Sequence, residues 1–174
     1  KTVGRLTDRV AIVTGGGRGI GQATSLRLAR DGASVVVNDI DPVPADETVA
    51  LIKEAGGTAV TCVANTVELE QAQSLIDTAI GTFGKIDILV NNAGVTRDKM
   101  FHGMTDELFD FVVDANLRTG YHTTLAAMPH MREVAKQEIA ANGTPAYNRK
   151  IVFTSSVAAL MGNPGQFNYT AAKG

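Results

Sequence analysis

The sequence has 174 residues but only one cysteine, so it offers no second thiol for an intrachain disulfide. A lone cysteine also fits a reducing compartment, and we expect a cytoplasmic protein. Sixteen Lys and Arg face 18 Asp and Glu, and a net charge of −2 gives no basic surface for nucleic acid or an anionic membrane. No apolar run approaches the roughly 18 residues of a membrane-spanning helix. Residues 1–9 are polar, so we expect no secretory signal there.

Hydrophobic residues make up 44% of the chain and charged residues 20%, a composition that excludes a disordered protein and favours one globular domain. Short apolar runs recur along the sequence without in-and-out alternation. Such runs predict buried strands of a sheet that is covered on both faces. The predicted strands are residues 10–13, 35–37, 59–63, 86–90 and 151–153.

Longer segments with helical periodicity separate these strands. The predicted helices are residues 19–31, residues 45–55, a segment capped by Thr66 and closed by Gly84, and residues 105 to about 135. The last has apolar positions at Leu108, Val112, Leu117, Leu125 and Met128, and residues 140–148 are predicted to form a surface loop. Alternating strands and helices of this length predict right-handed βαβ units, and therefore an α/β fold with a parallel sheet.

A glycine-rich segment joins the first strand to the first helix, with Gly15, Gly19 and Gly21 at its key positions. Glycine permits a tight turn and lets backbone N–H groups approach a pyrophosphate, while the new helix presents its positive end to the anion. The segment therefore predicts a dinucleotide site. A glycine-rich connection that only needs positive φ angles would have the same composition.

Asp39 follows the second predicted strand, 24 residues after Gly15, close to the spacing of about twenty residues expected of a ribose-binding acid. A carboxylate at that place accepts hydrogen bonds from an adenosine ribose and repels a 2′-phosphate, which favours NAD over NADP. Two alternatives stay open: Asp39 could cap the turn before Pro42, and Arg18 could pair with a 2′-phosphate. We expect NAD as the cofactor, with NADP as the alternative.

Tyr169 and Lys173 stand four residues apart, so a helix would place both on one face. A neighbouring ammonium stabilises a phenolate and lowers the pKa of tyrosine from its usual value near 10, which suits the pair to general acid–base work. Ser156 follows the fifth predicted strand, at the edge where parallel sheets bind ligands. Its hydroxyl could donate to a substrate carbonyl.

Together these motifs resemble the short-chain dehydrogenase/reductase family. The resemblance extends over essentially the whole chain and rests on residues 14–21, residues 91–94 (Asn-Asn-Ala-Gly), Ser156, and the Tyr169 and Lys173 pair. It implies a Rossmann-type doubly wound parallel sheet with strand order 3-2-1-4-5. It also implies an NAD(P)-dependent oxidoreductase that acts on a ketone or a secondary alcohol.

The resemblance assigns catalytic roles to Asn116, Ser156, Tyr169 and Lys173. Asn116 would hold a water of a proton relay that begins at Lys173, and Lys173 would also bond the nicotinamide ribose. Cofactor contacts are implied at Gly15, Arg18, Gly19, Ile20, Gly21, Asp39, Asn65, Thr66, Asn92, Ala93, Gly94, Tyr169 and Lys173. Asn65 and Thr66 depart from the Asp-Val that the family often carries near the adenine. No metal site is predicted, because the histidines have no carboxylate or cysteine partner at ligand spacing.

Within the family, residues 95–98 and 161–166 look like the 3-oxoacyl-thioester reductases of fatty acid metabolism. The predicted substrate is therefore a small carbonyl or alcohol compound, with an acyl thioester favoured. A hydroxysteroid or 3-hydroxyacyl-CoA dehydrogenase is the alternative within the family, and a non-catalytic nucleotide-binding module is the alternative outside enzymes. Family members are often homotetramers, so a tetramer or dimer is expected. They also continue past the residue that matches Gly174, and we expect the natural chain to be longer.

Overall fold

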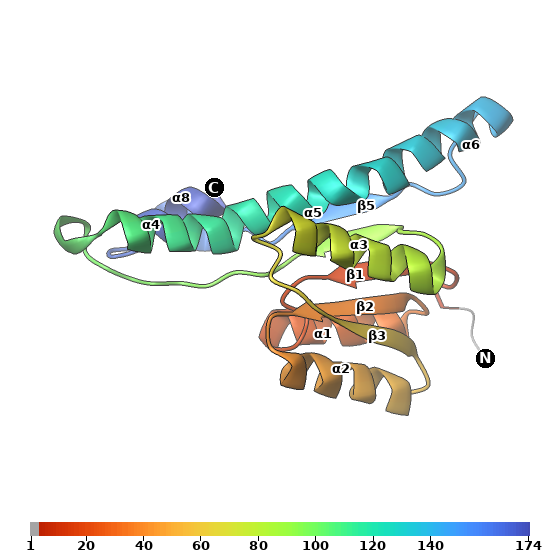
Figure 1. Ribbon diagram of the computed structural model, residues 1–174, viewed down its shortest axis with the longest axis horizontal. Helices are drawn as coiled ribbons and strands as arrows, with labels where there is room; N and C mark the ends of the chain where they lie inside the picture. Colours follow the sequence, from red (N-terminus) through yellow and green to blue (C-terminus); the bar gives the residue numbers. More distant parts are fainter. Residues whose placement is uncertain (1–3) are drawn as a thin grey trace.

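The computed structural model describes residues 4–174 and has a five-stranded parallel sheet (Figure 1). The strands are β1 (Val10–Val13), β2 (Ser34–Asp39), β3 (Thr58–Val63), β4 (Ile88–Asn91) and β5 (Lys150–Phe153). Their order is β3-β2-β1-β4-β5, which confirms the predicted α/β fold and strand order. Residues 1–3 of the polar segment that opens the sequence lie outside the described residues.

Helices cover both faces of the centre of the sheet. On β1, Ala11 and Val13 pack in the same apolar cluster as residues of α1 (Gly19–Arg30) and α2 (Pro42–Glu54). The alternate residues Val10 and Ile12 pack with α3 (Leu69–Phe83) and α5 (Thr119–Met128). This confirms the prediction of a doubly covered sheet for its central strands. Between residues 4 and 174, no helix is long and apolar enough to cross a membrane.

The prediction that all five strands are buried was wrong for β5. Val152 is 45% exposed and Phe153 is 54% exposed. The physical reason is position, because β5 lies at the edge of the sheet and pairs only with β4 in the described chain. The opposite edge strand, β3, also has an exposed residue in Val63. An apolar run therefore marks a strand without telling how well its neighbours cover it.

Two predicted helix starts were also wrong. Helix α2 begins at Pro42, three residues early, because Asp41 caps it by accepting a hydrogen bond of 3.2 Å from Val43 N. Proline is tolerated in a first helical turn, where its missing N–H would have no helical partner. Helix α3 begins at Leu69 after Glu68, so the buried Thr66 does not cap it. Its predicted end at Gly84 is confirmed, with Gly84 in the left-handed conformation.

The long helical segment runs from α4 (Asp106–Val113) through α5 to α6 (Val134–Asn142), with two π-helical turns, Asp114–Arg118 and Pro129–Glu133, between them. Thr105 caps its start, accepting a hydrogen bond from Leu108 N. The segment continues to Asn142, so the predicted end near residue 135 was wrong, and the loop predicted at 140–148 begins only at Gly143.

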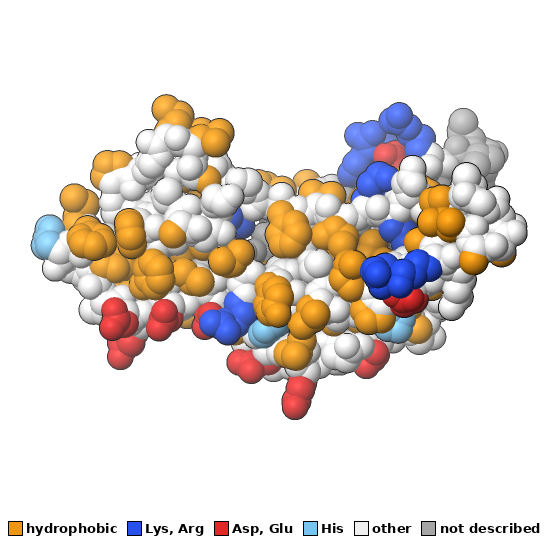
Figure 2. Space-filling view, turned by 90° about the horizontal axis from the view of Figure 1, so that it is seen from above, with side chains coloured by type: hydrophobic (Ala, Val, Ile, Leu, Met, Phe, Trp, Pro, Cys, Tyr) orange, Lys and Arg blue, Asp and Glu red, His pale blue; other side chains and the backbone are white. Residues whose placement is uncertain are grey.

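The long segment buries a partly different set of side chains from the one predicted. Leu117 and Leu125, predicted on its apolar face, are 49% and 46% exposed, whereas Asn116 and Thr123 are buried. Asn116 follows the buried Val112 by four residues, so the helical repeat places both on one face, whereas Leu117 lies one residue further round the helix. Figure 2 looks down on the side where this segment and β5 lie in Figure 1, and apolar side chains are spread across it.

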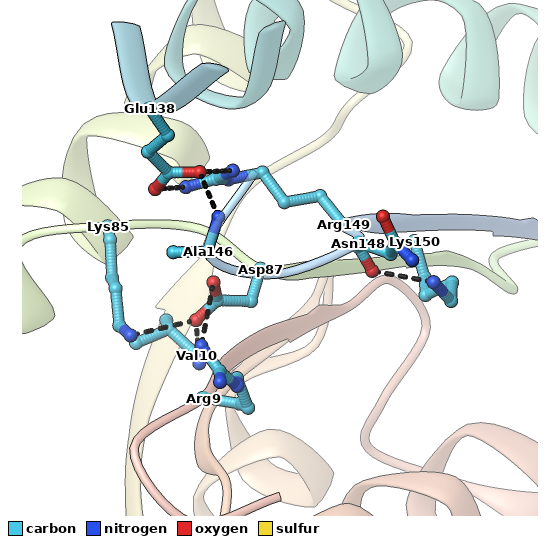
Figure 3. Close-up of polar contacts among 9 residues, drawn as sticks. All are labelled: Arg9, Val10, Lys85, Asp87, Glu138, Ala146, Asn148, Arg149 and Lys150. Carbon is cyan, nitrogen blue, oxygen red and sulfur yellow. Dashed lines mark hydrogen bonds and ion pairs between the residues drawn. The ribbon is translucent and has the colours of Figure 1, made fainter. Parts of the chain in front are cut away.

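Charged side chains join the elements at the amino ends of the strands (Figure 3). Asp87 is buried and accepts a hydrogen bond of 3.0 Å from Val10 N, and its other charged contacts are Lys85 at 3.2 Å and Arg9 at 3.8 Å. Glu138 of α6 forms a two-pronged ion pair with Arg149, at 2.9 and 3.0 Å. A cavity of about 300 Å³ lies here, at the amino ends of the strands, whereas the predicted site lies at their carboxyl ends.

Candidate active site

The glycine turn connects the carboxyl end of β1 to α1. Gly15 and Gly19 have φ angles of +59° and +51°, which only glycine adopts without strain. A Cβ on Gly21 would overlap the carbonyl oxygen of Gly15, so the third glycine lets the helix pack directly onto the turn. Arg18 immediately precedes α1, and its side chain makes no capping hydrogen bond to that helix. The first N–H groups of α1 are therefore left without a side-chain cap.

Thr14 and Asn92 fasten this turn to the end of β4. The Thr14 hydroxyl accepts hydrogen bonds from Asn92 N at 3.0 Å and Ala93 N at 3.1 Å. The Asn92 amide donates to the carbonyl oxygens of Thr14 and Gly15, at 3.1 and 3.2 Å. Both side chains thus hold β1 and β4 together. Between these two strands the strand order reverses, and α/β folds bind ligands at such a point.

Asp39 lies against the glycine turn. Its carboxylate accepts hydrogen bonds from Gly17 N at 3.1 Å and from Asp41 N at 3.2 Å. Arg18, the residue that could pair with a 2′-phosphate, instead pairs with Asp41 at 2.6 Å on the protein surface. The end of β2 therefore carries the carboxylates of Asp39 and Asp41, and the nearby Arg18 is already paired with Asp41.

Asn65 and Thr66 follow β3 at the same edge of the sheet. Asn65 is exposed and its side chain accepts a hydrogen bond of 3.3 Å from Val67 N, while its backbone N donates to Gln71 Oε1 at 2.7 Å. Thr66 is buried. Asn65 is thus the exposed member of the pair and Thr66 the buried one.

The two serines after β5 have different partners. Ser155 donates a hydrogen bond of 2.7 Å to the backbone carbonyl of Lys173. Ser156 precedes α7 (Val157–Met161), and its hydroxyl oxygen accepts a hydrogen bond of 3.2 Å from Ala158 N. A hydroxyl that accepts in this way keeps its own proton for donation, which fits the predicted use of Ser156 rather than Ser155.

Tyr169 and Lys173 both lie on α8 (Phe167–Lys173), as the four-residue spacing predicted. The Lys173 ammonium lies 6.0 Å from the centre of the Tyr169 ring and donates a hydrogen bond of 2.9 Å to the carbonyl oxygen of Thr154. Lys173 is only 9% exposed, and this burial lowers the pKa of its ammonium. Tyr169 is half-buried.

Asn116 lies in the first π-helical turn and points inward. Its Nδ2 donates to the carbonyl oxygens of Val95 and Val112, at 2.7 and 2.8 Å. Its Oδ1 is buried and has no hydrogen-bond partner among residues 4–174. A Cβ on Gly94 would overlap this oxygen and lie 3.1 Å from Lys173 Nζ, so both groups approach the same glycine.

The structure therefore brings several of the predicted residues together at the carboxyl ends of the strands, in two groups. Ser156 belongs to neither, because its side-chain hydrogen bond is with Ala158 of α7. Asn116, Lys173 and Gly94 meet beside Tyr169, and Gly15, Asp39 and Asn92 meet around the glycine turn. Arg18 and Ile20 are exposed rather than enclosed. The sequence analysis missed the contacts of Thr14, Ser155 and Asn168, since single polar residues beside a motif carry no periodic signal.

Comparisons with known proteins agree with this architecture. The sequence profile of the family described as short chain dehydrogenase matches residues 9–174. The chain is 43% identical to a 3-oxoacyl-[acyl-carrier-protein] reductase of Synechocystis, covering 97% of this chain and 64% of that protein. It is 42% identical to the hydroxyacyl-CoA dehydrogenase ChsB1 of Mycobacterium tuberculosis, covering 97% and 53%.

A solved structure is similar along nearly the whole chain. It is a short chain dehydrogenase from Mycobacterium avium, with a TM-score of 0.87 and 40% identity, and the match covers 98% of this chain and 60% of that one. The chain thus spans between about half and two thirds of the length of these relatives. With the profile match, the strand order and the glycine turn in agreement, this chain belongs to the short chain dehydrogenase family.

Proposed function

We propose that this chain forms the cofactor-binding and proton-transfer part of an oxidoreductase that interconverts a ketone and a secondary alcohol. The observation that carries the proposal is the meeting of Lys173 and the unpartnered Asn116 oxygen at Gly94, one helical turn from Tyr169. Buried polar atoms without a protein partner are rare in folded proteins, and a bound water would satisfy the Asn116 oxygen.

The residues of the glycine turn fit a dinucleotide. The uncapped start of α1 offers N–H groups and the positive end of a helix to a pyrophosphate. Gly15, Gly19 and Gly21 would border the pyrophosphate, and Asp39 would accept hydrogen bonds from the adenosine ribose. Arg18, Ile20, Asn65, Thr66, Asn92, Ala93 and Gly94 would complete the cofactor site. A bound nicotinamide cofactor supplies or takes up the hydride.

Asp39 and Asp41 favour NAD(H) over NADP(H) in this proposal. A 2′-phosphate beside the Asp39 carboxylate would meet a like charge, and like charges at contact cost several kcal/mol. Arg18 would have to leave Asp41 before it could compensate. The ribose hydroxyl of NAD(H), by contrast, can donate to Asp39.

Tyr169, Lys173, Ser156 and Asn116 would divide the proton chemistry. The Tyr169 hydroxyl would give a proton to the substrate oxygen during reduction and accept one during oxidation, and the Ser156 hydroxyl would donate a hydrogen bond to the same oxygen. The Lys173 ammonium would stabilise the Tyr169 phenolate and bond the nicotinamide ribose. Asn116 Oδ1 would hold the water through which Lys173 is resupplied with protons.

The substrate we propose is a 3-oxoacyl thioester. Support comes from the similarity to the relative named 3-oxoacyl-[acyl-carrier-protein] reductase and from residues 95–98 and 161–166. The relative named hydroxyacyl-CoA dehydrogenase favours a second candidate, in which the same residues oxidise a 3-hydroxyacyl-CoA. Exposed apolar side chains near the site, Leu160 and Met161, suit the hydrocarbon part of either substrate.

We also infer a homo-oligomer, a tetramer or a dimer. Large side chains stand exposed along the long helical segment at Phe111, Leu117, Tyr121 and Leu125. Leu117, Tyr121 and Leu125 recur every four residues and so lie along one side of the helix, and an exposed apolar face of this kind marks a protein interface. Light scattering of the full-length protein tests the oligomer, and a monomer at micromolar concentration would contradict it.

Tyr169→Phe in the full-length protein tests the proposed function. With NADH and acetoacetyl-CoA, we expect turnover to fall by about 10²- to 10⁴-fold while the Kd for NADH stays within about threefold. Tyr147→Phe is the matched control, because Tyr147 contacts Arg9 at the opposite edge of the sheet. Unchanged turnover in Tyr169→Phe would refute the proposal. NADH binding without turnover by the unmodified protein on any ketone would favour the nucleotide-binding module.

A further inference from the structure

Asn168 immediately precedes Tyr169 and is completely buried, whereas Tyr169 is half-buried. Its Nδ2 donates hydrogen bonds to the carbonyl oxygens of Arg97 and Leu108, each at 3.2 Å. Its Oδ1 accepts a hydrogen bond of 2.8 Å from the backbone N of Tyr169. Both amide protons and the amide oxygen are therefore used, so the side chain is fully satisfied in its buried place.

These three bonds join three parts of the chain. Arg97 belongs to the segment between β4 and the 3₁₀ turn Phe101–Gly103, Leu108 belongs to α4, and Tyr169 belongs to α8. Two further bonds run beside them, from Lys99 N to the carbonyl oxygen of Gly165 at 2.8 Å and from Gln166 Nε2 to Asp98 at 2.9 Å. Asn168 is the buried member of this row of contacts.

The geometry explains why an asparagine stands at this position. The N–H groups of a first helical turn have no partner within the helix, and Asn168 Oδ1 satisfies that of Tyr169. Two carbonyl oxygens require two donors on one short side chain. Aspartate would offer acceptors to both carbonyls, leucine has no polar atoms, and glutamine would extend the amide by one methylene.

The segment that Asn168 holds is part of the candidate active site at its other end. Gly94 approaches Asn116 and Lys173, and the next residue, Val95, accepts the hydrogen bond from Asn116. Asn168 fixes the same segment at Arg97, two residues further on. One side chain therefore links the backbone position of Tyr169 to the segment against which Asn116 and Lys173 pack.

We propose that Asn168 is a positioning residue that sets where the Tyr169 hydroxyl lies relative to Lys173 and the substrate oxygen. The inference rests on the proposed function and adds a residue to it. Displacing a reacting group by about 1 Å costs about a hundredfold in rate. Loss of the three bonds would let the start of α8 shift away from α4 and from the segment after β4.

The test compares Asn168→Leu, which keeps the branched shape of the side chain but cannot form hydrogen bonds, with the unmodified full-length protein. Asn142→Asp, on the exposed end of α6, is the control. NADH titration first counts the folded sites, and turnover is then expressed per NADH-binding site. We expect this turnover to fall between about tenfold and a hundredfold, with the KM for NADH little changed. The primary isotope effect with 4-deuterated NADH should rise, because the chemical step becomes slower.

A purely structural role would lower the number of NADH-binding sites and leave turnover per site and the isotope effect unchanged. Less than a fivefold loss per site would overturn the proposal. If Asn168→Leu binds no NADH, Asn168→Ser, which keeps one donor and one acceptor, is judged by the same fivefold criterion. Tyr169→Phe distinguishes failure of the proposed function from failure of the positioning role. If Tyr169→Phe retains turnover, the proposed function is wrong. If Tyr169→Phe is inactive but the Asn168 variants turn over normally, only the positioning role of Asn168 is wrong.

Discussion

The Lys173 ammonium lies 6.0 Å from the centre of the Tyr169 ring, and both side chains lie on one face of α8. The ammonium is buried and donates to the carbonyl oxygen of Thr154. The Ser155 hydroxyl, one residue further on, donates to the carbonyl oxygen of Lys173. The segment after β5 therefore holds Lys173 at both its side chain and its backbone, which fixes the charge near the phenol.

Lys173→Met should raise the melting temperature at pH 7 while lowering turnover by at least about a hundredfold. Burial lowers the pKa of the Lys173 ammonium, so the folded protein carries this charge at a cost in stability. Differential scanning calorimetry measures the change, with Lys136→Met as the control, because Lys136 is exposed and paired with Glu133.

The pH dependence of that difference follows from the direction of the pKa shift. Below the lowered pKa, Lys173 is protonated in both states and the cost is complete. As pH rises from there toward the ordinary lysine value of about 10.4, the unfolded chain binds more protons than the folded one, so the stability of the unmodified protein increases. The difference in melting temperature between the unmodified protein and Lys173→Met should therefore become smaller. A difference that stays constant up to pH 10 would contradict this account.

Gly94→Ala should impair the site without unfolding the protein. The new Cβ would overlap Asn116 Oδ1 and lie 3.1 Å from Lys173 Nζ, so both groups must move apart. We expect turnover to fall at least tenfold. Gly81→Ala is the control, because a Cβ there meets nothing within 4 Å and alanine stabilises a helix interior by about 0.5–1 kcal/mol. Equal turnover in Gly94→Ala and Gly81→Ala would show that turnover does not depend on where Asn116 and Lys173 lie.

Asp39→Ala should weaken the preference for NAD(H) over NADP(H) by about tenfold, which corresponds to about 1.4 kcal/mol. Asp41→Ala should act differently, because it frees Arg18 to pair with a 2′-phosphate and improves NADP(H) binding without weakening that of NAD(H). Fluorescence titrations with the two reduced cofactors measure both effects. A native preference for NADPH would contradict the assigned role of Asp39.

Asp87→Asn should destabilise the fold by about 1–3 kcal/mol, since the buried carboxylate accepts from Val10 N and neutralises Lys85 and Arg9. Urea unfolding measures the loss, with the exposed Asp77→Asn expected to stay within about 0.5 kcal/mol. Because Asp87 lies at the edge opposite to the candidate site, turnover per folded molecule should not change. A selective loss of turnover would show that the two edges are coupled.

The sequence predicted the framework of this protein because its signals are local. Five short apolar runs separated by helical segments predict a parallel α/β sheet, and the glycines between β1 and α1 predict the turn, since each depends on residues close together in the chain. The spacing of Tyr169 and Lys173 likewise predicts their shared face from the helical repeat alone.

Tertiary structure decided the features that join distant segments. The packing of the long segment against the rest of the fold decides which of its faces is covered, so Asn116 is buried while Leu117 and Leu125 are exposed. Asn168 bonds Arg97 and Leu108, about 60 to 70 residues away, and Thr14 bonds residues after β4. Hydrogen bonds of this kind depend on where packing places a donor and an acceptor in space. Periodicity gives no information on that placement, so the sequence located the motifs of the site and only the fold showed what holds them in place.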